Sequence, residues 1–412
     1  MKRNILIMAF LCLSVWAKGQ SHTEPITIGH VDTLYSTSLK EKRPLLIYVP
    51  PHDTVYFSKP AYPVLYFFDG DGHFAFLQSM IRNLSGNNGN AIFPEMIIVG
   101  IANTRGNRDR DLTPVADTTF DKRSGGGEKF TAFLEKELIP YIDKNYPTAP
   151  YRTLIGHSLG GLMAINTLIH HADLFNAYVA IDPSMFFGNH AILKQTEAIL
   201  QHQDFKGKSL FLAIANTMGT GMDTLRVRKD TALVNRHIRA ILKLSDNLKA
   251  HPSNNLKWAF KYYPDDSHFS VPPIAEYDGL RFIFASNKFP GDQPMPPFFD
   301  KTITPDSLKK LIIAHYKLLS QEMGYQVRPS ESMMNMLGYS FLQQKDYERS
   351  YMFFDQNINY YPHNFNVYDS MGDYYLENNK RIKAVEYFKK ALTIKYRQEI
   401  KDKLLKLEKE AK

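Results

Sequence analysis

The sequence predicts an α/β fold, in which a mostly parallel sheet carries helices on both faces, followed by a small all-helical domain. Continuous apolar runs such as 62–68, 95–102 and 209–215 are typical of strands that are buried on both faces, and amphipathic helical segments alternate with them. Beyond residue 304 only helical patterns remain. A chain of 412 residues is also too long for one ordinary domain, which favours two units.

The first twenty residues have the features of a secretory signal peptide. Positive charge at 2–3 precedes an apolar run at 5–16 that is too short to span a bilayer, and 17–20 offers small and polar residues for cleavage. The only cysteine, Cys12, lies in that run and makes a poor lipid-attachment site, because Leu11 before it is large. We therefore expect a periplasmic or secreted protein whose processed form has no disulfide and no cysteine-based metal site.

Residues 21–288 are expected to form the α/β domain. The expected strands, after an initial strand region in 21–42, are 43–50, 62–68, 95–102, a short segment ending at Gly156, 177–181, 209–215 and 256–263. The expected helices are about 128–145, the segment after Gly160, one from about 191, 231–248 and 274–285. In parallel sheets the chemistry gathers in the loops at the carboxyl ends of the strands, and the charged clusters of this chain fall in such loops.

A stretch rich in proline and aspartate, 289–304, is predicted to be a linker, and 305–412 is predicted to be the helical domain. Glycine and aromatic residues recur there with a spacing of 34, in the pairs Gly338/Gly372 and Phe354/Phe388. This period resembles that of tetratricopeptide helix pairs. About two units are expected, with 398–412 as a polar capping helix, and they offer a surface for a protein partner.

A nucleophilic serine is predicted at the centre of Gly-His-Ser-Leu-Gly at 156–160, between a strand and a helix. This pattern in this context is the nucleophile elbow of α/β-hydrolases. The strained turn projects the hydroxyl of Ser158 beyond the sheet, and its glycines keep side chains out of the places where the turn packs on itself. The expected oxyanion donors are the amide of Leu159, at the start of the helix, and the amides of Gly70 and Asp71, after an earlier strand.

The expected general base is His268, because it follows the last predicted strand and the histidine comes last in this triad order. The acid is expected in the loop after 209–215, where Asp223 is the first choice. The alternatives that stay open are Asp230, Asp265, Asp266 and a serine–histidine pair without an acid.

The other histidines are given no catalytic role. His170, His171 and His237 fall in predicted helices, where we interpret them as surface or packing residues, and His157 is too close to Ser158 in sequence to act as its base. No metal and no cofactor are expected, since the acidic turn at 69–72 lacks the closing glutamate of a calcium loop. The formal charge of +8 is mild, and no basic block is interleaved with aromatic residues, so a nucleic-acid role is poorly supported.

Taken together, these segments resemble the putative esterase family of α/β-hydrolases, which includes siderophore, feruloyl, acetylxylan and esterase D-like enzymes. The similarity covers about 25–288. It is carried by 64–71, 108–114, 156–161, 181–184 and 263–268. One departure is Asp182-Pro183-Ser184, where the family often has Ser-Pro-Ser, and the sequence assigns no role to the added carboxylate.

The resemblance implies that Ser158 is the nucleophile, that His268 is the base, and that the segment 108–111 lines the substrate pocket. Three arginines of that loop, Arg105, Arg108 and Arg110, would suit an anionic or catecholate substrate. Alternatively they are solvated charges that pair with Asp109 and Asp111.

The sequence thus indicates a secreted carboxylic-ester hydrolase that acts through an acyl-enzyme on Ser158. Its expected substrate is a siderophore lactone or an acyl- or feruloyl-decorated polysaccharide. Two alternatives stay open: a catalytically inert hydrolase fold that binds a protein through its helical repeats, and acyl transfer to a sugar or lipid rather than to water.

Overall fold

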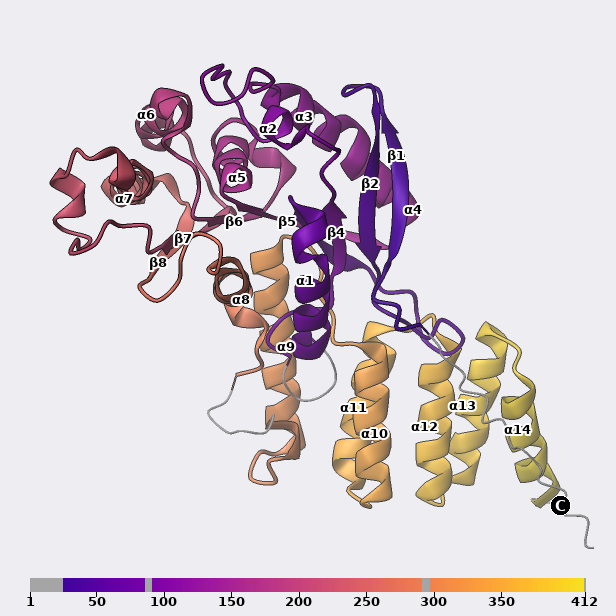
Figure 1. Ribbon diagram of the computed structural model, residues 1–412. Coiled ribbons are helices and arrows are strands. Elements are labelled where there is room, and N and C mark those ends of the chain that lie inside the picture. The colour runs from indigo at the N-terminus through magenta and orange to yellow at the C-terminus, as the bar shows by residue number, and fades with distance from the viewer. Residues whose placement is uncertain (1–24, 86–90, 291–296, 411–412) are drawn as a thin grey trace, which may run out of the picture.

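The computed structural model describes residues 25–85, 91–290 and 297–410, and it has the expected α/β fold followed by an all-helical region (Figure 1). Eight strands form one sheet in the order β1-β2-β4-β3-β5-β6-β7-β8. Strand β2 is antiparallel to both β1 and β4, whereas all other neighbours are parallel. The strands are β1 (His30–Ser36), β2 (Glu41–Tyr48), β3 (Tyr62–Phe67), β4 (Ile97–Ile101), β5 (Thr148–His157), β6 (Ala177–Ile181), β7 (Ser209–Ala215) and β8 (Lys257–Tyr263).

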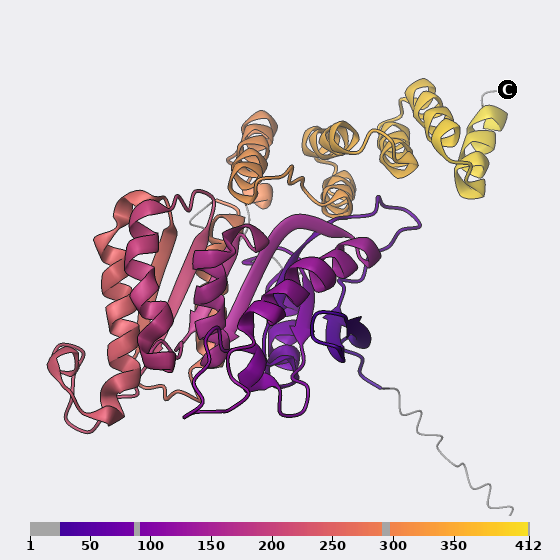
Figure 2. The ribbon, with the colours of Figure 1, turned by 90° about the horizontal axis from the view of Figure 1, so that it is seen from above.

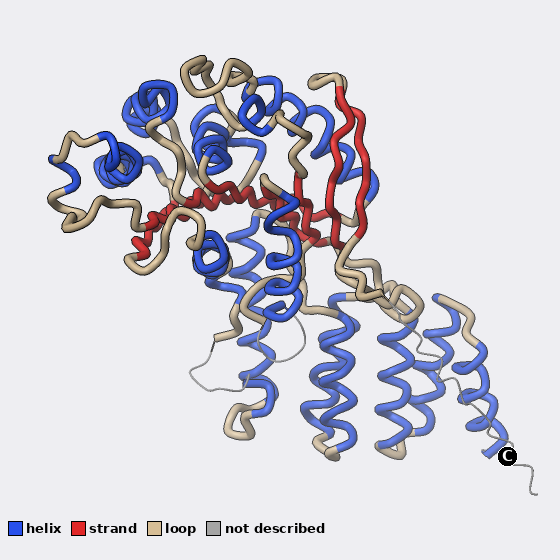
Figure 3. Tube along the Cα trace, in the orientation of Figure 1, coloured by secondary structure: helices blue, strands red, loops and turns tan. Residues whose placement is uncertain are grey.

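Helices cover both faces of the sheet, as Figure 3 shows with the red strands between blue helices. One face carries α1 (Gly70–Ser85) and α8 (Pro272–Ile283). The other carries α3 (Gly127–Phe133), a π-helical turn at Leu134–Leu138, α4 (Ile139–Asn145), α5 (Leu159–His170), α6 (Phe187–His202) and α7 (Arg236–Ala250), with the short α2 (Arg108–Asp111) above it.

Strand β3 shows why its sequence is apolar without interruption. Its alternate side chains Val64 and Tyr66 belong to the core under α3 to α7, and Leu65 and Phe67 belong to the core under α1 and α8. All four are at most 1% exposed. A strand covered on both faces must be apolar at every position, so the continuous run is a direct consequence of the two layers of helices.

The carboxyl ends of the parallel strands point to one edge of the sheet, and the helical domain lies along the opposite edge (Figure 2). This domain comprises α9 (Pro305–Met323), α10 (Glu331–Gln343), α11 (Tyr347–Tyr360), α12 (Phe365–Glu377), α13 (Arg381–Ile394) and α14 (Gln398–Glu410). The loop between β2 and β3 holds it through hydrogen bonds from the amide of Ser58 to Glu331 and from Asn364 to the carbonyl of Tyr56, at 2.8 and 2.9 Å. The end of α9 packs Met323 into the core under α1 and α8.

The glycine and phenylalanine pairs found 34 residues apart make the same contact in each helix pair. A Cβ atom on Gly338 would lie 2.4 Å from the ring of Phe354, and one on Gly372 would lie 2.5 Å from the ring of Phe388. The recurring contact explains the spacing, because each ring needs a position without a side chain on the facing helix. The assignment of these helices to the tetratricopeptide class stays a prediction.

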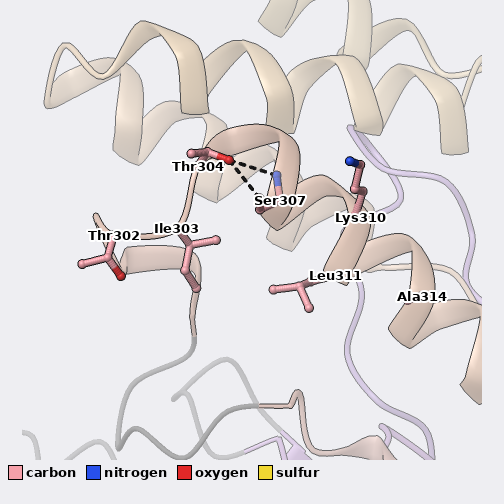
Figure 4. Close-up of a pocket in the computed structure, with 7 residues that line it drawn as sticks. All are labelled: Thr302, Ile303, Thr304, Ser307, Lys310, Leu311 and Ala314. Atoms are coloured by element: carbon pink, nitrogen blue, oxygen red, sulfur yellow. Dashed lines mark hydrogen bonds between the residues drawn. The ribbon is translucent and has the colours of Figure 1, made fainter.

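A shallow groove of about 610 Å³ lies at the start of α9 (Figure 4). Thr304 caps this helix by accepting the N–H of Ser307. The lining residues are Thr302, Ile303, Thr304, Ser307, Lys310, Leu311 and Ala314. None of them is a candidate catalytic residue, and the groove belongs to the helical domain.

The predicted signal peptide at 1–20, with Cys12, lies outside the described residues, as do 291–296 of the predicted linker. Among the helices that the structure describes, none combines the length and the apolarity needed to cross a bilayer.

Candidate active site

Ser158 lies at the turn between β5 and α5 in a backbone conformation that few residues adopt. Its φ is 59° and its ψ is −116°. The turn is tight, because a Cβ atom on Gly156 would lie 2.1 Å from the carbonyl oxygen of Gly160. Only glycine fits there, and within this turn the strained residue is the one whose hydroxyl must project from the sheet.

Three strand-to-helix connections bring Ser158, His268 and Asp182 together. The Nε2 atom of His268 lies 3.0 Å from the hydroxyl of Ser158, and its Nδ1 atom lies 2.6 Å from Oδ2 of Asp182. Strands β5, β6 and β8 precede these residues, and they end at the same edge of the sheet. The predicted pair of Ser158 and His268 is therefore within hydrogen-bonding distance, and a carboxylate stands behind the imidazole.

Asp182 is fully buried and receives three hydrogen bonds. Oδ1 accepts the backbone N–H of Ala215 at 2.9 Å, while Oδ2 lies 2.6 Å from His268 and 2.8 Å from Nε2 of His237. Burial alone would raise the pKa of Asp182, but the hydrogen bonds from His237 and His268 lower this pKa far below its ordinary value. The group is therefore a carboxylate, and both ring nitrogens that face it carry protons.

The prediction that Asp223 is the acid of the triad is wrong, because this side chain does not lie next to His268. Its side chain is 53% exposed and accepts the backbone N–H groups of Leu225 and Arg226. The open alternatives are exposed or bonded to other residues. Asp230 accepts from Asn235 and Arg239, Asp265 is exposed, and Asp266 accepts from Ser270. The first position after β7 is occupied by Asn216, whose amide groups bind the carbonyls of Asp266 and Pro264 instead.

Two residues of the site were thus assigned no role from the sequence. Asp182 stands directly after β6, and the departure from Ser-Pro-Ser was the signal that could have identified it. His237 lies in the first turn of α7 and was interpreted as a surface or packing residue, whereas its ring nitrogen faces the buried carboxylate. No local pattern distinguishes it from the other helical histidines.

His157 supports the other side of His268. Its Nε2 atom lies 2.8 Å from the backbone carbonyl oxygen of His268, and the two ring centroids are 4.5 Å apart. Burial and the neighbouring His268 lower the pKa of His157 to about 4. His157 is therefore neutral at pH 7 and donates to the carbonyl, which fixes the loop that carries His268.

A hydrogen-bonded pair of His73 and the buried Glu276 lies next to this histidine. Nδ1 of His73 is 2.6 Å from Glu276, whose side chain is 1% exposed, and the rings of His73 and His157 are 6.5 Å apart. Burial would lower the pKa of His73, but the hydrogen bond and charge of Glu276 raise it above its ordinary value. Helix α1 is thereby joined to α8 beside the candidate site.

The expected oxyanion donors lie at the starts of two neighbouring helices. Leu159 is the first residue of α5, and Gly70 and Asp71 are the first two residues of α1. Such positions have no intrahelical acceptor for their N–H groups. Strands β3 and β5, which lead into these helices, are adjacent in the sheet, so both helix N-termini meet at the edge that carries Ser158.

Two of the three expected pocket arginines are engaged by carboxylates. Arg108 makes two bonds to Asp69, at 2.6 and 2.8 Å, and Arg110 binds Glu41 and Asp111. Arg105 is exposed and has no hydrogen-bonding or ionic partner among the described residues. Arg110 does pair with Asp111, but this carboxylate is buried and not solvated, and Arg108 pairs with Asp69 in place of Asp109 or Asp111.

The ligand atoms of Asp182, His237 and His268 lie within 4.8 Å of one another, which is close enough to hold a metal ion. The donor set of one carboxylate and two imidazoles would suit zinc. The hydrogen bonds described above already account for this arrangement, since each ring N–H and the amide of Ala215 has the carboxylate as its acceptor.

Comparison with known proteins gives consistent matches. Residues 36–251 match a family model described as "Putative esterase". The chain is 26% identical over 272 residues to the ferri-bacillibactin esterase BesA of Bacillus subtilis, and the match covers 62% of this chain and 90% of BesA.

Solved structures extend the similarity. The IroE-like serine hydrolase from Shewanella oneidensis is 32% identical, with a TM-score of 0.67, over 81% of this chain and 99% of that one. An uncharacterised protein from Capnocytophaga ochracea is 16% identical, with a TM-score of 0.57, over 92% of this chain and 99% of that one. The second likeness shows a shared fold alone, and its coverage extends into the helical domain.

Proposed function

The chain belongs to the putative esterase family, and from this premise we propose that it hydrolyses the ester bonds of a siderophore through an acyl-enzyme on Ser158. The observation that carries the proposal is the line of hydrogen bonds from Ser158 through His268 to the buried Asp182. The siderophore as substrate class is supported by the relatives, of which BesA is a ferri-bacillibactin esterase.

In the proposed reaction, Nε2 of His268 accepts the proton of Ser158 as the serine oxygen attacks the ester carbonyl. Asp182 holds the proton of His268 on Nδ1, so Nε2 keeps the free lone pair that a base needs. The amides of Leu159, Gly70 and Asp71 donate to the oxyanion, where each donor stabilises the transition state by a few kcal/mol. His268 then protonates the leaving alcohol, and water releases the acyl group by the same steps in reverse.

The charges around the site favour one arginine as a substrate contact. Arg108 and Arg110 are held by carboxylates, which leaves the exposed Arg105 to meet an anionic substrate. We propose that Arg108 acts indirectly, by holding Asp69 beside the elbow. An added Cβ atom on Gly160 would lie 3.7 Å from Oδ2 of Asp69, which shows how close that pair is to the elbow helix.

The test is hydrolysis of an ester panel by residues 21–412 and by the Ser158→Ala variant. The panel holds a ferric tri-catecholate trilactone, the same trilactone without iron, methyl ferulate, an acetylated xylan and p-nitrophenyl acetate. We expect Ser158-dependent turnover with a preference for the trilactone, and an exposed-serine variant, Ser253→Ala, should retain wild-type rates.

Preference for methyl ferulate or acetylated xylan would overturn the siderophore as substrate and leave the proposed esterase activity standing. If no panel ester is hydrolysed in a Ser158-dependent way, the proposed activity itself is overturned, and a binding protein is favoured. Mass spectrometry of the products in ¹⁸O-labelled water separates hydrolysis from acyl transfer, because only hydrolysis places the label in the released acid.

We also propose export to the periplasm or the medium, supported by the features of residues 1–20. Expression of the full chain in a bacterial host followed by intact-mass measurement tests this. A product that begins near residue 21 in the exported fraction supports the proposal, and an uncleaved cytoplasmic product would contradict it.

A further inference from the structure

We infer that His237 is a positioning residue for the proposed ester hydrolysis: as a second hydrogen-bond donor, it holds the triad carboxylate in the orientation that His268 needs. The inference rests on the proposed function. Its basis is that two histidines from different elements, the first turn of α7 and the loop after β8, share the same oxygen atom of Asp182.

The surroundings of His237 fix its ring in this position. The ring is 5.1 Å from that of His268 in an edge-on arrangement and 5.4 Å from that of Phe186. The side chain is 15% exposed, and Asp182 is fully buried. A buried carboxylate oxygen keeps its orientation only if its donors are fixed, so His237 determines which way Oδ2 points and therefore where the Nδ1 proton of His268 is held.

Two arginines of α7 close to His237 have other partners. Arg236 precedes it and stacks on the ring of Phe186 at 4.6 Å, and Arg239 pairs with Asp230 at 3.3 Å. Among the described residues of α7, His237 is therefore the one that donates to Asp182.

The experiment measures how fast a fluorophosphonate labels Ser158 at neutral pH, with Ser158→Ala as the blank. This probe reports activation of the serine without any natural ester, so it separates the inference from the choice of substrate. The variants are His237→Leu, which removes the donor, His237→Gln, whose amide N–H can donate from nearly the same place, and His202→Leu, an exposed histidine on α6 as the matched control.

We expect His237→Leu to lower the labelling rate at neutral pH by about 10- to 100-fold, as is common for groups that orient a catalytic side chain. His237→Gln should stay within about threefold of the wild type, because the hydrogen bond is kept. His202→Leu should be unchanged.

The inference is overturned if folded His237→Leu labels at the wild-type rate. It is also overturned if the leucine and glutamine variants are equally slow, since that result would indicate packing alone. If the wild type labels at Ser158 with this pattern but hydrolyses no siderophore, the inference stands and the proposed substrate fails. If nothing labels at Ser158, both fail.

Discussion

Asp182→Asn is the substitution that tests the triad most directly, because an amide cannot satisfy the three donors that converge on this residue. Its oxygen can face either the N–H of Ala215 or the two imidazoles, but not both. If the amide NH₂ faces His268, the histidine must turn its Nδ1 lone pair toward it and carry its proton on Nε2. In that tautomer His268 cannot accept the proton of Ser158.

The expected loss follows from the charge that is removed. Two unit charges about 4 Å apart interact by about 4 kcal/mol at an effective dielectric constant of about 20, which is the attraction between the carboxylate and the imidazolium that forms in the transition state. Each ~1.4 kcal/mol is a factor of ten, so this term alone is worth about a thousandfold. The wrong tautomer adds to it, and we expect kcat/KM to fall by about 10³- to 10⁴-fold.

The assay is kcat/KM for p-nitrophenyl acetate and for the preferred ester, with melting temperature as the check on folding. Asp223→Asn is the matched control, because that side chain is exposed and serves only a local turn, and we expect it to keep its activity within about twofold. The reasoning would be refuted if Asp182→Asn kept more than about a tenth of the activity while Asp223→Asn lost more than tenfold.

Three further outcomes follow from the structure. Gly156→Ala places a Cβ atom 2.1 Å from a backbone carbonyl oxygen, so the free energy of unfolding measured by urea titration should fall by about 3 kcal/mol. The control Gly72→Ala adds a Cβ atom with nothing within 4 Å, and it should be no less stable than the wild type. Arg43→Met removes a guanidinium 2.7 Å from the buried Asp111, which keeps its bond to Arg110, and should cost about 2–3 kcal/mol of stability; a loss below about 0.5 kcal/mol would contradict this ion pair. Folding lowers the pKa of His157 to about 4, so between pH 4 and about pH 6.5 this histidine is protonated in the unfolded chain and neutral in the folded one. The free energy of unfolding should therefore decline by ~3 kcal/mol as the pH falls through that range. The decline should be shallower in His157→Gln, and an equal slope in both proteins would count against the buried neutral form.

Sequence patterns predicted the features that depend on local order along the chain. The elbow at Ser158 is a contiguous motif, and His268 follows the last strand, so both could be assigned without knowing which strands are neighbours. The helical stretch expected at about 128–145 is observed as continuous helix over 127–145. Helix α1 was not expected, because the glycines and aspartates at its start are typical of turns.

The features that were missed depend on the order of strands in the sheet. Asp182 reaches His268 because β6 lies beside β5, and nothing in the local sequence states that pairing. The acid was expected after β7, but Asn216 takes that position, and a carboxylate one strand nearer to the nucleophile stands in its place. His237 depends in addition on how α7 packs over the same edge, which no spacing along the chain reveals.

The apolar contact between α9 and the sheet has a consequence for how the protein can be divided. Met323, with Tyr325 and Val327, covers a core that also contains Tyr151 and Phe284. A fragment that ends after α8 would present these aromatic side chains to water, and exposed apolar patches of this kind promote self-association. We therefore expect shortened versions of the chain to stay monomeric only if they retain α9 and the segment up to Val327.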